Sequence, residues 1–202
     1  GRIKIRNIIK KRFINKVAVV TGSSRGIGSA IALAIGKEGA KIVLNGRDEI
    51  RLQEVQAELT QQGIEAVYFQ ADVSDFQQAK ELSNFALQTF GKIDILVNNV
   101  GISSRGYLAD LDPSVLEQVF KSNVFGTIYP TQAALPALRE SKGSIVIISS
   151  LAGIHGLPGL SPYSASKMAL TSFVESLRIE EHAQQVHIGM LQVAMTEIVH
   201  NK

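Results

Sequence analysis

Short apolar segments alternate with amphipathic segments along most of the 202 residues. The apolar segments are rich in β-branched residues and poor in polar ones, which is typical of strands buried on both faces of a parallel sheet. We expect strands at 16–21, 41–44, 66–70, 93–97, 144–148 and 186–191. Because strands that alternate with helices form right-handed βαβ units, the pattern predicts an α/β fold: a doubly wound parallel sheet of the Rossmann type in a three-layer sandwich.

Helical periodicity fills the segments between these strands. Apolar residues recur at helical spacing after a glycine-rich segment near residue 27, from about residue 48, and at 75–90, 113–138 and 163–183. Asp48 has the residue type of an N-cap, and Pro130 and Pro136 are expected to interrupt the fourth helix. Ligands of doubly wound sheets bind beyond the carboxyl ends of the strands, so the polar motifs at those ends form the candidate site.

Charge is distributed unevenly along the chain. The net charge is +3, yet residues 1–16 contain seven basic residues and no acidic one. The remainder carries 14 basic against 18 acidic residues, which argues against a nucleic-acid-binding surface. The chain has no cysteine, so disulfides and thiolate metal sites are excluded. We expect no metal and a cytoplasmic location.

The basic start of the chain has a pattern of its own. Ile5, Ile9 and Phe13 share one helical stripe among Lys and Arg residues, which favours weak contact of residues 1–14 with a membrane surface, peripheral to it. An arm packed on the body is the alternative. No apolar run reaches the ~18 residues of a transmembrane helix. Charges break up the apolar residues of this segment, so no signal peptide is expected.

A glycine-rich segment, TGSSRGIG at residues 21–28, stands between the first strand and the first helix. Glycines permit a tight turn and close approach of the backbone to a pyrophosphate. The helix that follows presents free N–H groups and its positive end to that anion. A strand before and a helix after favour a dinucleotide site over a plain turn. The predicted contacts are Gly22, Ser24, Gly26, Ile27 and Gly28.

The end of the second strand distinguishes the two nicotinamide dinucleotides. A carboxylate there binds the ribose hydroxyls of NAD, whereas a basic group accommodates the extra phosphate of NADP. This chain reads Asn45-Gly46-Arg47, and Arg25 lies in the glycine loop. Two guanidinium groups can converge on one phosphate with bidentate hydrogen bonds. We therefore expect NADP(H), with NAD(H) as the less favoured cofactor.

Tyr163 and Lys167 stand at i and i+4 of a predicted helix, in the sequence YSASK. They are expected on one helix face, about 5–6 Å apart at Cβ. A phenol normally ionises near pH 10, and a nearby ammonium group favours the phenolate. Such a tyrosine can act as general acid in carbonyl reduction and as general base in alcohol oxidation. For this motif alone, an amphipathic pair on a solvated face is the alternative.

The glycine spacing, the NNVG segment at 98–101 and the Tyr-Lys pair together resemble the classical short-chain dehydrogenase/reductase (SDR) family. The resemblance covers about residues 15–200. It implies that Asp72 and the Val73 backbone contact the adenine, although Asp72 alone would more often cap a turn. It further implies that two residues of the NNVG segment shape the floor of the cofactor site, namely Asn99 and Gly101.

The resemblance also assigns the reacting groups. Ser150 would hydrogen-bond the substrate oxygen, and Tyr163 would exchange a proton with it. Lys167 would hold the nicotinamide ribose, and Asn123 would order a water that bridges to Lys167. Exposure on a helix surface is the alternative for Asn123. Gly46 stands where NAD-preferring relatives carry an acid, which agrees with the expectation of NADP.

Two features depart from the family pattern. The sixth strand is not followed by the usual Pro-Gly, which puts the grip of Thr196 on the nicotinamide carboxamide in doubt. The chain also stops before the substrate-lid region of the relatives, and a truncated sequence is the favoured explanation. We divide the chain into a basic N-terminal segment, 1–15, and a single dinucleotide-binding and catalytic domain, 16–202, that lacks this lid.

The sequence therefore predicts an NADP(H)-dependent oxidoreductase that transfers a hydride between the cofactor and a carbonyl or secondary alcohol, with Tyr163 as general acid/base. A catalytically weak NADP-binding sensor or scaffold of the same fold is the alternative. By resemblance, the helices at 113–138 and 163–183 would pair across a two-fold axis in a homodimer or homotetramer. The loops at 102–108 and 151–162 would line the pocket for a small carbonyl or alcohol, and their residues select no single substrate.

Overall fold

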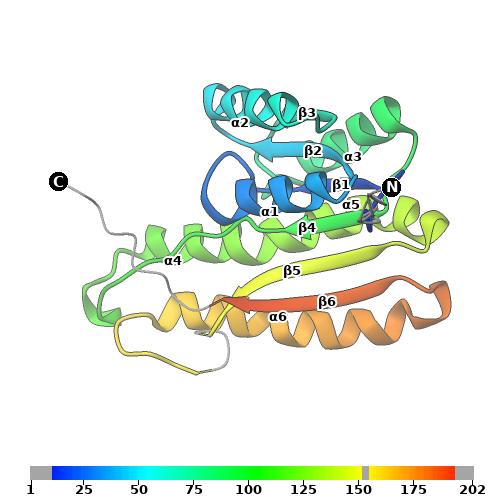
Figure 1. Cartoon of the computed structure of the whole chain (residues 1–202). Coiled ribbons are helices and arrows are strands. Elements are labelled where there is room, and N and C mark those ends of the chain that lie inside the picture. Colours follow the sequence, from blue (N-terminus) through cyan, green and yellow to red (C-terminus); the bar gives the residue numbers. More distant parts are fainter. Residues whose placement is uncertain (1–10, 152–154, 194–202) are drawn as a thin grey trace, which may run out of the picture.

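Six parallel strands form one sheet in the order β3-β2-β1-β4-β5-β6 (Figure 1). The structure, a computed structural model, describes residues 11–151 and 155–193. The chain runs outward from β1 to β3 and then returns to the other side of β1 for β4. This reversal is the switch point of a doubly wound sheet, so the predicted fold class is confirmed. The strands are β1 Val17–Val20, β2 Lys41–Gly46, β3 Ala66–Gln70, β4 Ile95–Asn98, β5 Ser144–Ser150 and β6 His187–Val193.

Helices cover both faces of this sheet. One face carries α1 (Gly26–Lys37) and α2 (Glu49–Gln61). The other carries α3 (Phe76–Phe90), α5 (Gly126–Ser141) and α6 (Ser161–Glu180), and α4 (Pro113–Phe120) leads into α5 (Figure 1). The described residues also form two short 3₁₀ turns, η1 (Leu108–Asp110) and η4 (His182–Gln184).

The central strand divides the core in two. Val17 and Val19 of β1 pack with the residues of α3, α5 and α6, whereas Ala18 and Val20 pack with those of α1 and α2. All four side chains are at most 1% exposed. Because successive residues of a strand point to opposite faces, a strand covered on both sides has to be apolar at every position. That is the pattern on which the strand prediction rested.

Helix α2 begins where the sequence predicted. The Asp48 carboxylate accepts a hydrogen bond from the Arg51 amide at 3.1 Å. Asp75 caps α3 in the same way, through the Gln78 amide at 2.9 Å. Such caps typically contribute about 1 kcal/mol each, and they fix the points at which the chain leaves the carboxyl ends of β2 and β3.

Pro130 and Pro136 do not interrupt a helix, contrary to the sequence prediction. Helix α5 runs through both, and the irregularity lies earlier, in a π-helical turn, η2, at Lys121–Phe125. A proline inside a helix removes a hydrogen bond and crowds the preceding turn, at a cost of about 3 kcal/mol. Apolar burial along the same helix offsets this cost, because Ala134 and Leu138 are almost fully buried in the core.

The described part of the N-terminal segment is a turn at residues 12–15. The Phe13 side chain packs against the core cluster of α1 and α2, and the Phe13 amide donates to the Glu38 carbonyl at 2.9 Å. Phe13 is thus part of an arm packed on the body, while Ile5 and Ile9 lie outside the described residues. Within the two described ranges, no helix has the length and apolarity needed to cross a membrane.

Candidate active site

The glycine loop connects β1 to α1 at the switch point. Gly22 and Gly26 both have φ of +59°, a conformation that side chains disfavour. Arg25 occupies the N-cap position of α1, and its side chain makes no capping hydrogen bond. The first N–H groups of α1 are therefore open to an anion at the mouth of the loop.

Close backbone approach explains the third glycine of the loop. A Cβ at Gly28 would collide with the Gly22 carbonyl oxygen and lie 2.5 Å from Asn99 Nδ2. Asn99 Nδ2 donates to that same Gly22 oxygen at 3.0 Å, and the Asn99 amide donates to Thr21 Oγ1 at 3.0 Å. Asn99 thereby holds the end of β4 against the glycine loop.

A groove of about 520 Å³ opens beside this loop. Its volume falls within the ~300–1,000 Å³ of small-molecule sites. The loops that follow β1, β2, β3 and β4 all contribute to it, which places it at the switch point where doubly wound sheets bind ligands. Ten residues assigned to cofactor binding line it: Gly22, Ser24, Arg25, Gly26, Ile27, Arg47, Asp72, Val73, Asn99 and Gly101. Gly28 lies behind the groove, against the loop.

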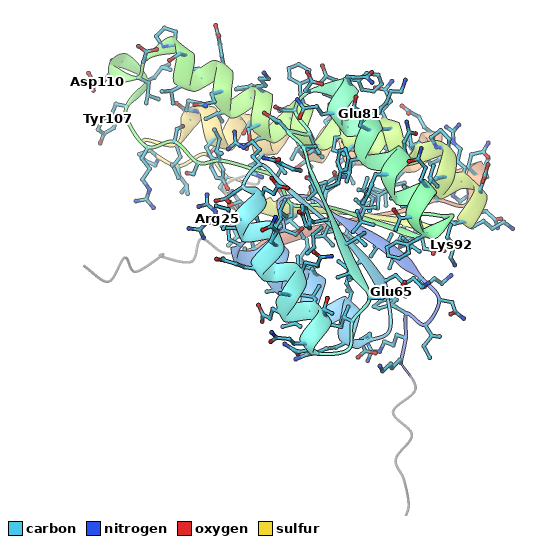
Figure 2. All side chains as sticks on the ribbon, turned by 90° about the horizontal axis from the view of Figure 1, so that it is seen from above. Arg25, Glu65, Glu81, Lys92, Tyr107 and Asp110 are labelled. Carbon is cyan, nitrogen blue, oxygen red and sulfur yellow. The ribbon has the colours of Figure 1, made fainter. Side chains whose placement is uncertain are left out.

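Arg25 and Arg47 are the two arginines of the groove. Neither forms an ion pair with any residue that the structure describes. Figure 2 shows Arg25 on the same side of the molecule as Tyr107 and Asp110, with Lys92 on the opposite side. That side is the carboxyl edge of the sheet, and both guanidinium groups are available there to an anionic ligand.

Asp72 caps a turn at the end of β3. The sequence predicted this role as the alternative to an adenine contact. Its Oδ1 accepts hydrogen bonds from the Ser74 amide at 3.0 Å and from Ser74 Oγ at 2.6 Å. Partial burial alone would raise the pKa of Asp72. The two Ser74 hydrogen bonds and the charges of Arg47 and Lys121 outweigh this, so the pKa is lowered. The carboxylate is therefore ionised at neutral pH beside the two cations.

Some features of the groove were not assigned from the sequence. The start of the π-turn and the end of α4 contribute Gln118, Lys121 and Ser122 to the wall. A Cβ at Gly46 would lie 3.1 Å from Ser24 Oγ, so Ser24 takes up the space beside position 46. No local motif marks Gln118, Lys121 and Ser122, because they reach the groove only through the packing of α4 and the π-turn across the sheet end.

Tyr163 and Lys167 lie one turn apart at the start of α6. The Lys167 Nζ atom is 5.8 Å from the centroid of the Tyr163 ring, so the two side chains share a helix face as expected. Tyr163 is partly exposed, whereas Lys167 is only 5% exposed. Burial lowers the pKa of Lys167 to about 8, because the ammonium group loses its hydration.

Asn123 lies in the π-turn and is fully buried, which rules out a surface position. Its Oδ1 accepts from the Ile102 amide at 2.7 Å, and its Nδ2 donates to the Ile102 carbonyl at 2.9 Å. The same Nδ2 donates to Ser166 Oγ at 3.0 Å, and Ser166 Oγ donates to the Tyr163 carbonyl at 2.7 Å. Asn123 thus connects the loop after β4 to the first turn of α6.

Gly101 is the residue at which these groups converge. A Cβ there would lie 3.0 Å from Lys167 Nζ and 3.2 Å from Asn123 Oδ1, and Gly101 also lines the groove. The buried ammonium group therefore adjoins the groove floor. Ser150 ends β5 and is 3% exposed. Thr196, expected at the nicotinamide carboxamide, lies outside the described residues.

Comparison with known proteins places this site in a family. The family model for short chain dehydrogenase matches residues 16–202. A versicolorin reductase of Emericella nidulans is 38% identical over 84% of this chain, and an uncharacterised oxidoreductase of Staphylococcus aureus is 36% identical over 90% of it. The matched regions amount to 64% and 80% of those two proteins. The chain belongs to the short-chain dehydrogenase family.

Solved structures agree with this assignment and include complexes with both dinucleotides. A short chain dehydrogenase/reductase from Burkholderia phymatum in complex with NAD has a TM-score of 0.88 and 32% identity, covering 91% of this chain and 67% of that one. An alcohol dehydrogenase from Thermococcus sibiricus complexed with 5-hydroxy-NADP has a TM-score of 0.87 and 31% identity, covering 90% of this chain and 77% of that one. These two neighbours thus bind a nicotinamide dinucleotide, one as NAD and the other as an NADP derivative.

Proposed function

We propose that the chain is an NADP(H)-dependent oxidoreductase that transfers a hydride between the nicotinamide cofactor and a carbonyl or secondary alcohol. The observation that carries the proposal is the convergence at Gly101, where the groove, the Lys167 ammonium group and the Asn123 amide meet. A dinucleotide groove that adjoins a buried ammonium group, with Tyr163 one turn away, suits proton transfer beside a bound nicotinamide.

The residues of the groove support a dinucleotide with an extra phosphate. The absence of a side chain at Gly28 lets the glycine loop pack closely against the start of α1, whose open N–H groups would bind the pyrophosphate. Arg25 and Arg47 would hold the additional phosphate of NADP, and Gly46 offers no carboxylate that would favour NAD. When bound, the cofactor supplies or accepts the hydride.

Tyr163 would carry the proton that the substrate oxygen gains in reduction or loses in oxidation. The Lys167 ammonium group favours the phenolate through its charge, and it would also hold the ribose beside the nicotinamide. Ser150 would donate a hydrogen bond to the same substrate oxygen and so orient it toward Tyr163. General acid–base catalysis of this kind typically contributes 10²–10⁴-fold to the rate.

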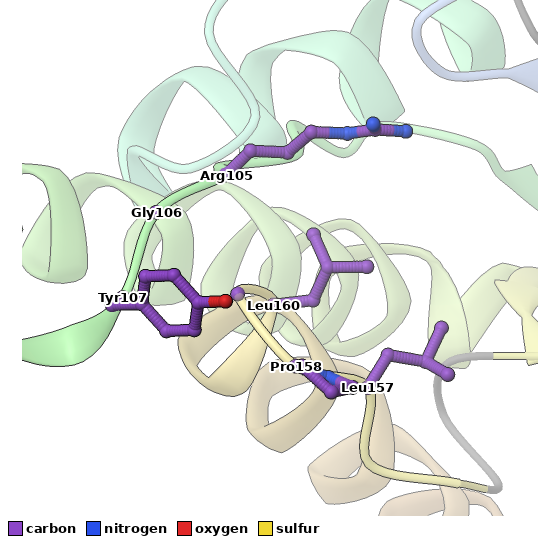
Figure 3. Close-up of a pocket in the computed structure, with 7 residues that line it drawn as sticks. Arg105, Gly106, Tyr107, Leu157, Pro158 and Leu160 are labelled. Atoms are coloured by element: carbon purple, nitrogen blue, oxygen red, sulfur yellow. The ribbon is translucent and has the colours of Figure 1, made fainter.

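A second pocket, of about 430 Å³, lies between the loop after β4 and the loop before α6. The Gly106 amide joins the two loops by donating to the Gly159 carbonyl at 3.0 Å. Figure 3 shows Arg105 on one side of the pocket and the side chains of Leu157 and Leu160 on the other. Leu160 lies three residues before Tyr163. The mostly apolar lining favours a carbonyl compound with an apolar body over a polyhydroxylated one.

A panel of ketones and aldehydes with NADPH, followed at the absorbance of the reduced nicotinamide, tests the proposal. We expect saturable oxidation of NADPH that depends on the carbonyl compound, fastest with apolar ketones. The scaffold alternative predicts saturable NADPH binding in a fluorescence titration without turnover of any compound. That result would replace the enzyme with a cofactor-binding protein of the same fold.

A further inference from the structure

The π-turn η2 leaves the helix between α4 and α5 locally widened. Within it, the Gly126 amide donates to the Lys121 carbonyl, five residues back. Asn123 lies in the middle of this turn and is fully buried. Single π-turns inside helices are frequent at functional sites, and their i→i+5 hydrogen bonds replace the regular helical pattern. Hydrogen bonds outside the regular helical pattern are therefore needed to fix the orientation of the Asn123 peptide group.

Two threonine hydroxyls fill that role on the following turns. Thr127 Oγ1 donates to the Asn123 carbonyl at 2.9 Å, and Thr131 Oγ1 donates to the Thr127 carbonyl at 2.8 Å. Thr131 Oγ1 in turn accepts from Asn98 Nδ2 at 2.9 Å. The two threonines and Asn98 are each at most 2% exposed. We call Asn98, Thr131 and Thr127 the amide–hydroxyl ladder.

The amide–hydroxyl ladder connects two parts of the candidate site. Asn98 is the last residue of β4, immediately before Asn99, which holds the glycine loop. At its other end the ladder reaches the Asn123 carbonyl, and the Asn123 side chain reaches Ile102 and Ser166. Hydrogen bonds in a buried chain of this kind polarise one another and are directional.

We propose that Thr127 and Thr131 are positioning residues for the reaction. They fix the peptide of Asn123 to the end of β4, and so place the Asn123 amide between the loop after β4 and the backbone of Tyr163. They touch neither cofactor nor substrate. The inference rests on the proposed oxidoreductase function, since its main measurement is turnover.

A purely structural role is the competing explanation. Threonines often donate back to the carbonyl four residues earlier, and this bends helices without any link to function. Thr60, an exposed residue near the end of α2, makes that bond to the Gln56 carbonyl at 2.8 Å, and it does not line the cofactor groove. Thr60 therefore serves as a matched control for the loss of one such hydrogen bond.

The test compares Thr127→Val, Thr131→Val and Thr60→Val, because valine keeps the β-branched shape and replaces the hydroxyl with a methyl group. For the carbonyl compound reduced fastest with NADPH, we expect kcat to fall about three- to tenfold in each of the first two variants. The Kd for NADPH should stay within about twofold, because the groove residues are unchanged. Thr60→Val should match the unaltered protein in both measurements, and Thr127→Ser should restore kcat.

The double variant adds a second criterion. If Thr127 and Thr131 act through one chain of bonds, the combined loss in kcat should be smaller than the product of the two single losses. Unchanged kcat in Thr127→Val overturns the proposal, as does an equal loss of kcat in Thr60→Val. If Thr127→Val fails to fold, full activity of Thr131→Val overturns it instead.

A readout without turnover separates this inference from the proposed function. Hydrogen exchange of a peptide that spans the π-turn should be faster in Thr127→Val than in the unaltered protein, with no such change in Thr60→Val. If the unaltered protein turns over no carbonyl compound, the proposed function fails. In that case, an unchanged rate of hydrogen exchange at the π-turn in Thr127→Val also overturns the proposal that the amide–hydroxyl ladder positions Asn123.

Discussion

The Lys167 ammonium group lies 5.8 Å from the centroid of the Tyr163 ring, one helical turn along α6. It is also 3.0 Å from the position that a Cβ at Gly101 would occupy. One buried cation therefore faces the phenol on one side and the floor of the cofactor groove on the other. The positive charge of Lys167 can therefore act both on the ionisation of Tyr163 and on the cofactor proposed to bind in the groove.

The first prediction concerns the pH dependence of activity. Burial lowers the pKa of Lys167 to about 8, so the ammonium group loses its proton as the pH rises through that value. The stabilisation of phenolate and the hold on the ribose weaken together. We expect kcat/KM for carbonyl reduction to fall above about pH 8, in a profile measured between pH 6 and pH 10. A flat profile across that range would contradict the assignment.

The same burial predicts a gain in stability when the charge is removed. The folded-state pKa of Lys167 lies below its unfolded value, about 10.4, so the cost of burying the charge is fully present below pH 8 and disappears as the pH rises through about 8 to 10.4. Lys167→Met should therefore unfold at a higher temperature than the unaltered protein at pH 7. The difference should shrink by pH 10, while activity is lost throughout.

Sequence reasoning reached the fold because its signals are local or periodic. Residues 163 and 167 share a helix face by helix geometry alone, and the unbroken apolar run of β1 follows from burial on both sides. The turn cap at Asp72 also had a local signal, since Ser74 follows two residues later. These features depend on neighbours in the chain, and a sequence displays them directly.

What sequence reasoning missed depends on contacts between distant residues. Asn123 holds Ile102, 21 residues earlier, and Ser166, 43 residues later, and no spacing rule predicts such a contact. The sequence predicted that Pro130 and Pro136 interrupt α5, because the helical hydrogen bond that each proline loses can be read from the sequence. The apolar burial that compensates for it appears only in the structure. Lys121 reaches the groove for the same reason, through the packing of α4.

A further prediction concerns the choice between dinucleotides. Arg47→Asp replaces a guanidinium group of the groove with a carboxylate, beside the ionised Asp72. A charge-assisted hydrogen bond contributes about 1.5–3 kcal/mol, so the Kd for NADPH should rise roughly 10- to 100-fold. The Kd for NADH should change far less. Lys80→Asp, on the exposed surface of α3, makes the same change in net charge and should leave both affinities unaltered. Equal affinities for both cofactors in the unaltered protein would reject the preference.

Acid stability should depend on one partly buried ion pair. Glu181 is 1% exposed and accepts from Arg139 Nε at 2.8 Å and Nη2 at 2.6 Å. The hydrogen bonds from Arg139 lower the pKa of Glu181, so its contribution to stability is present above the unfolded pKa of about 4.3 and is lost as the pH falls through the lower folded value. Glu181→Gln should lower Tm by about 5 °C at pH 7, and the difference should narrow below about pH 4.

The control for this prediction is an ion pair on the surface. Lys41 and Glu65 lie 3.3 Å apart, and the Glu65 side chain is 61% exposed. Exposed pairs contribute little, so Glu65→Gln should leave Tm almost unchanged at both pH values. A similar loss of Tm in the two variants would show that burial of Glu181 does not matter.

Assembly into a dimer or tetramer is expected from the apolar side chains that α6 exposes. Ile179 is 80% exposed and Met168 is 46% exposed on this helix. Ile179→Glu should shift the protein toward the monomer in light scattering at micromolar concentration, because a carboxylate is costly in an apolar interface. Ile50→Glu on α2, where Ile50 is 71% exposed on the other face of the sheet, should not. An unaltered protein that is already monomeric would contradict the expectation.

The strongest test of the chemistry is Tyr163→Phe, which removes the phenolic hydroxyl and keeps the ring. Without this proton donor, kcat for carbonyl reduction should fall by at least 10²-fold, while the Kd for NADPH stays close to normal, since the groove residues are untouched. Ser150→Ala should cost less, because its proposed part is orientation. Tyr107→Phe is the matched control, since Tyr107 lines the neighbouring pocket and its phenol has no proposed part in proton transfer. If Tyr163→Phe turned over at the normal rate while Tyr107→Phe did not, the general acid would be Tyr107, and the role assigned to the Tyr163–Lys167 pair would be wrong.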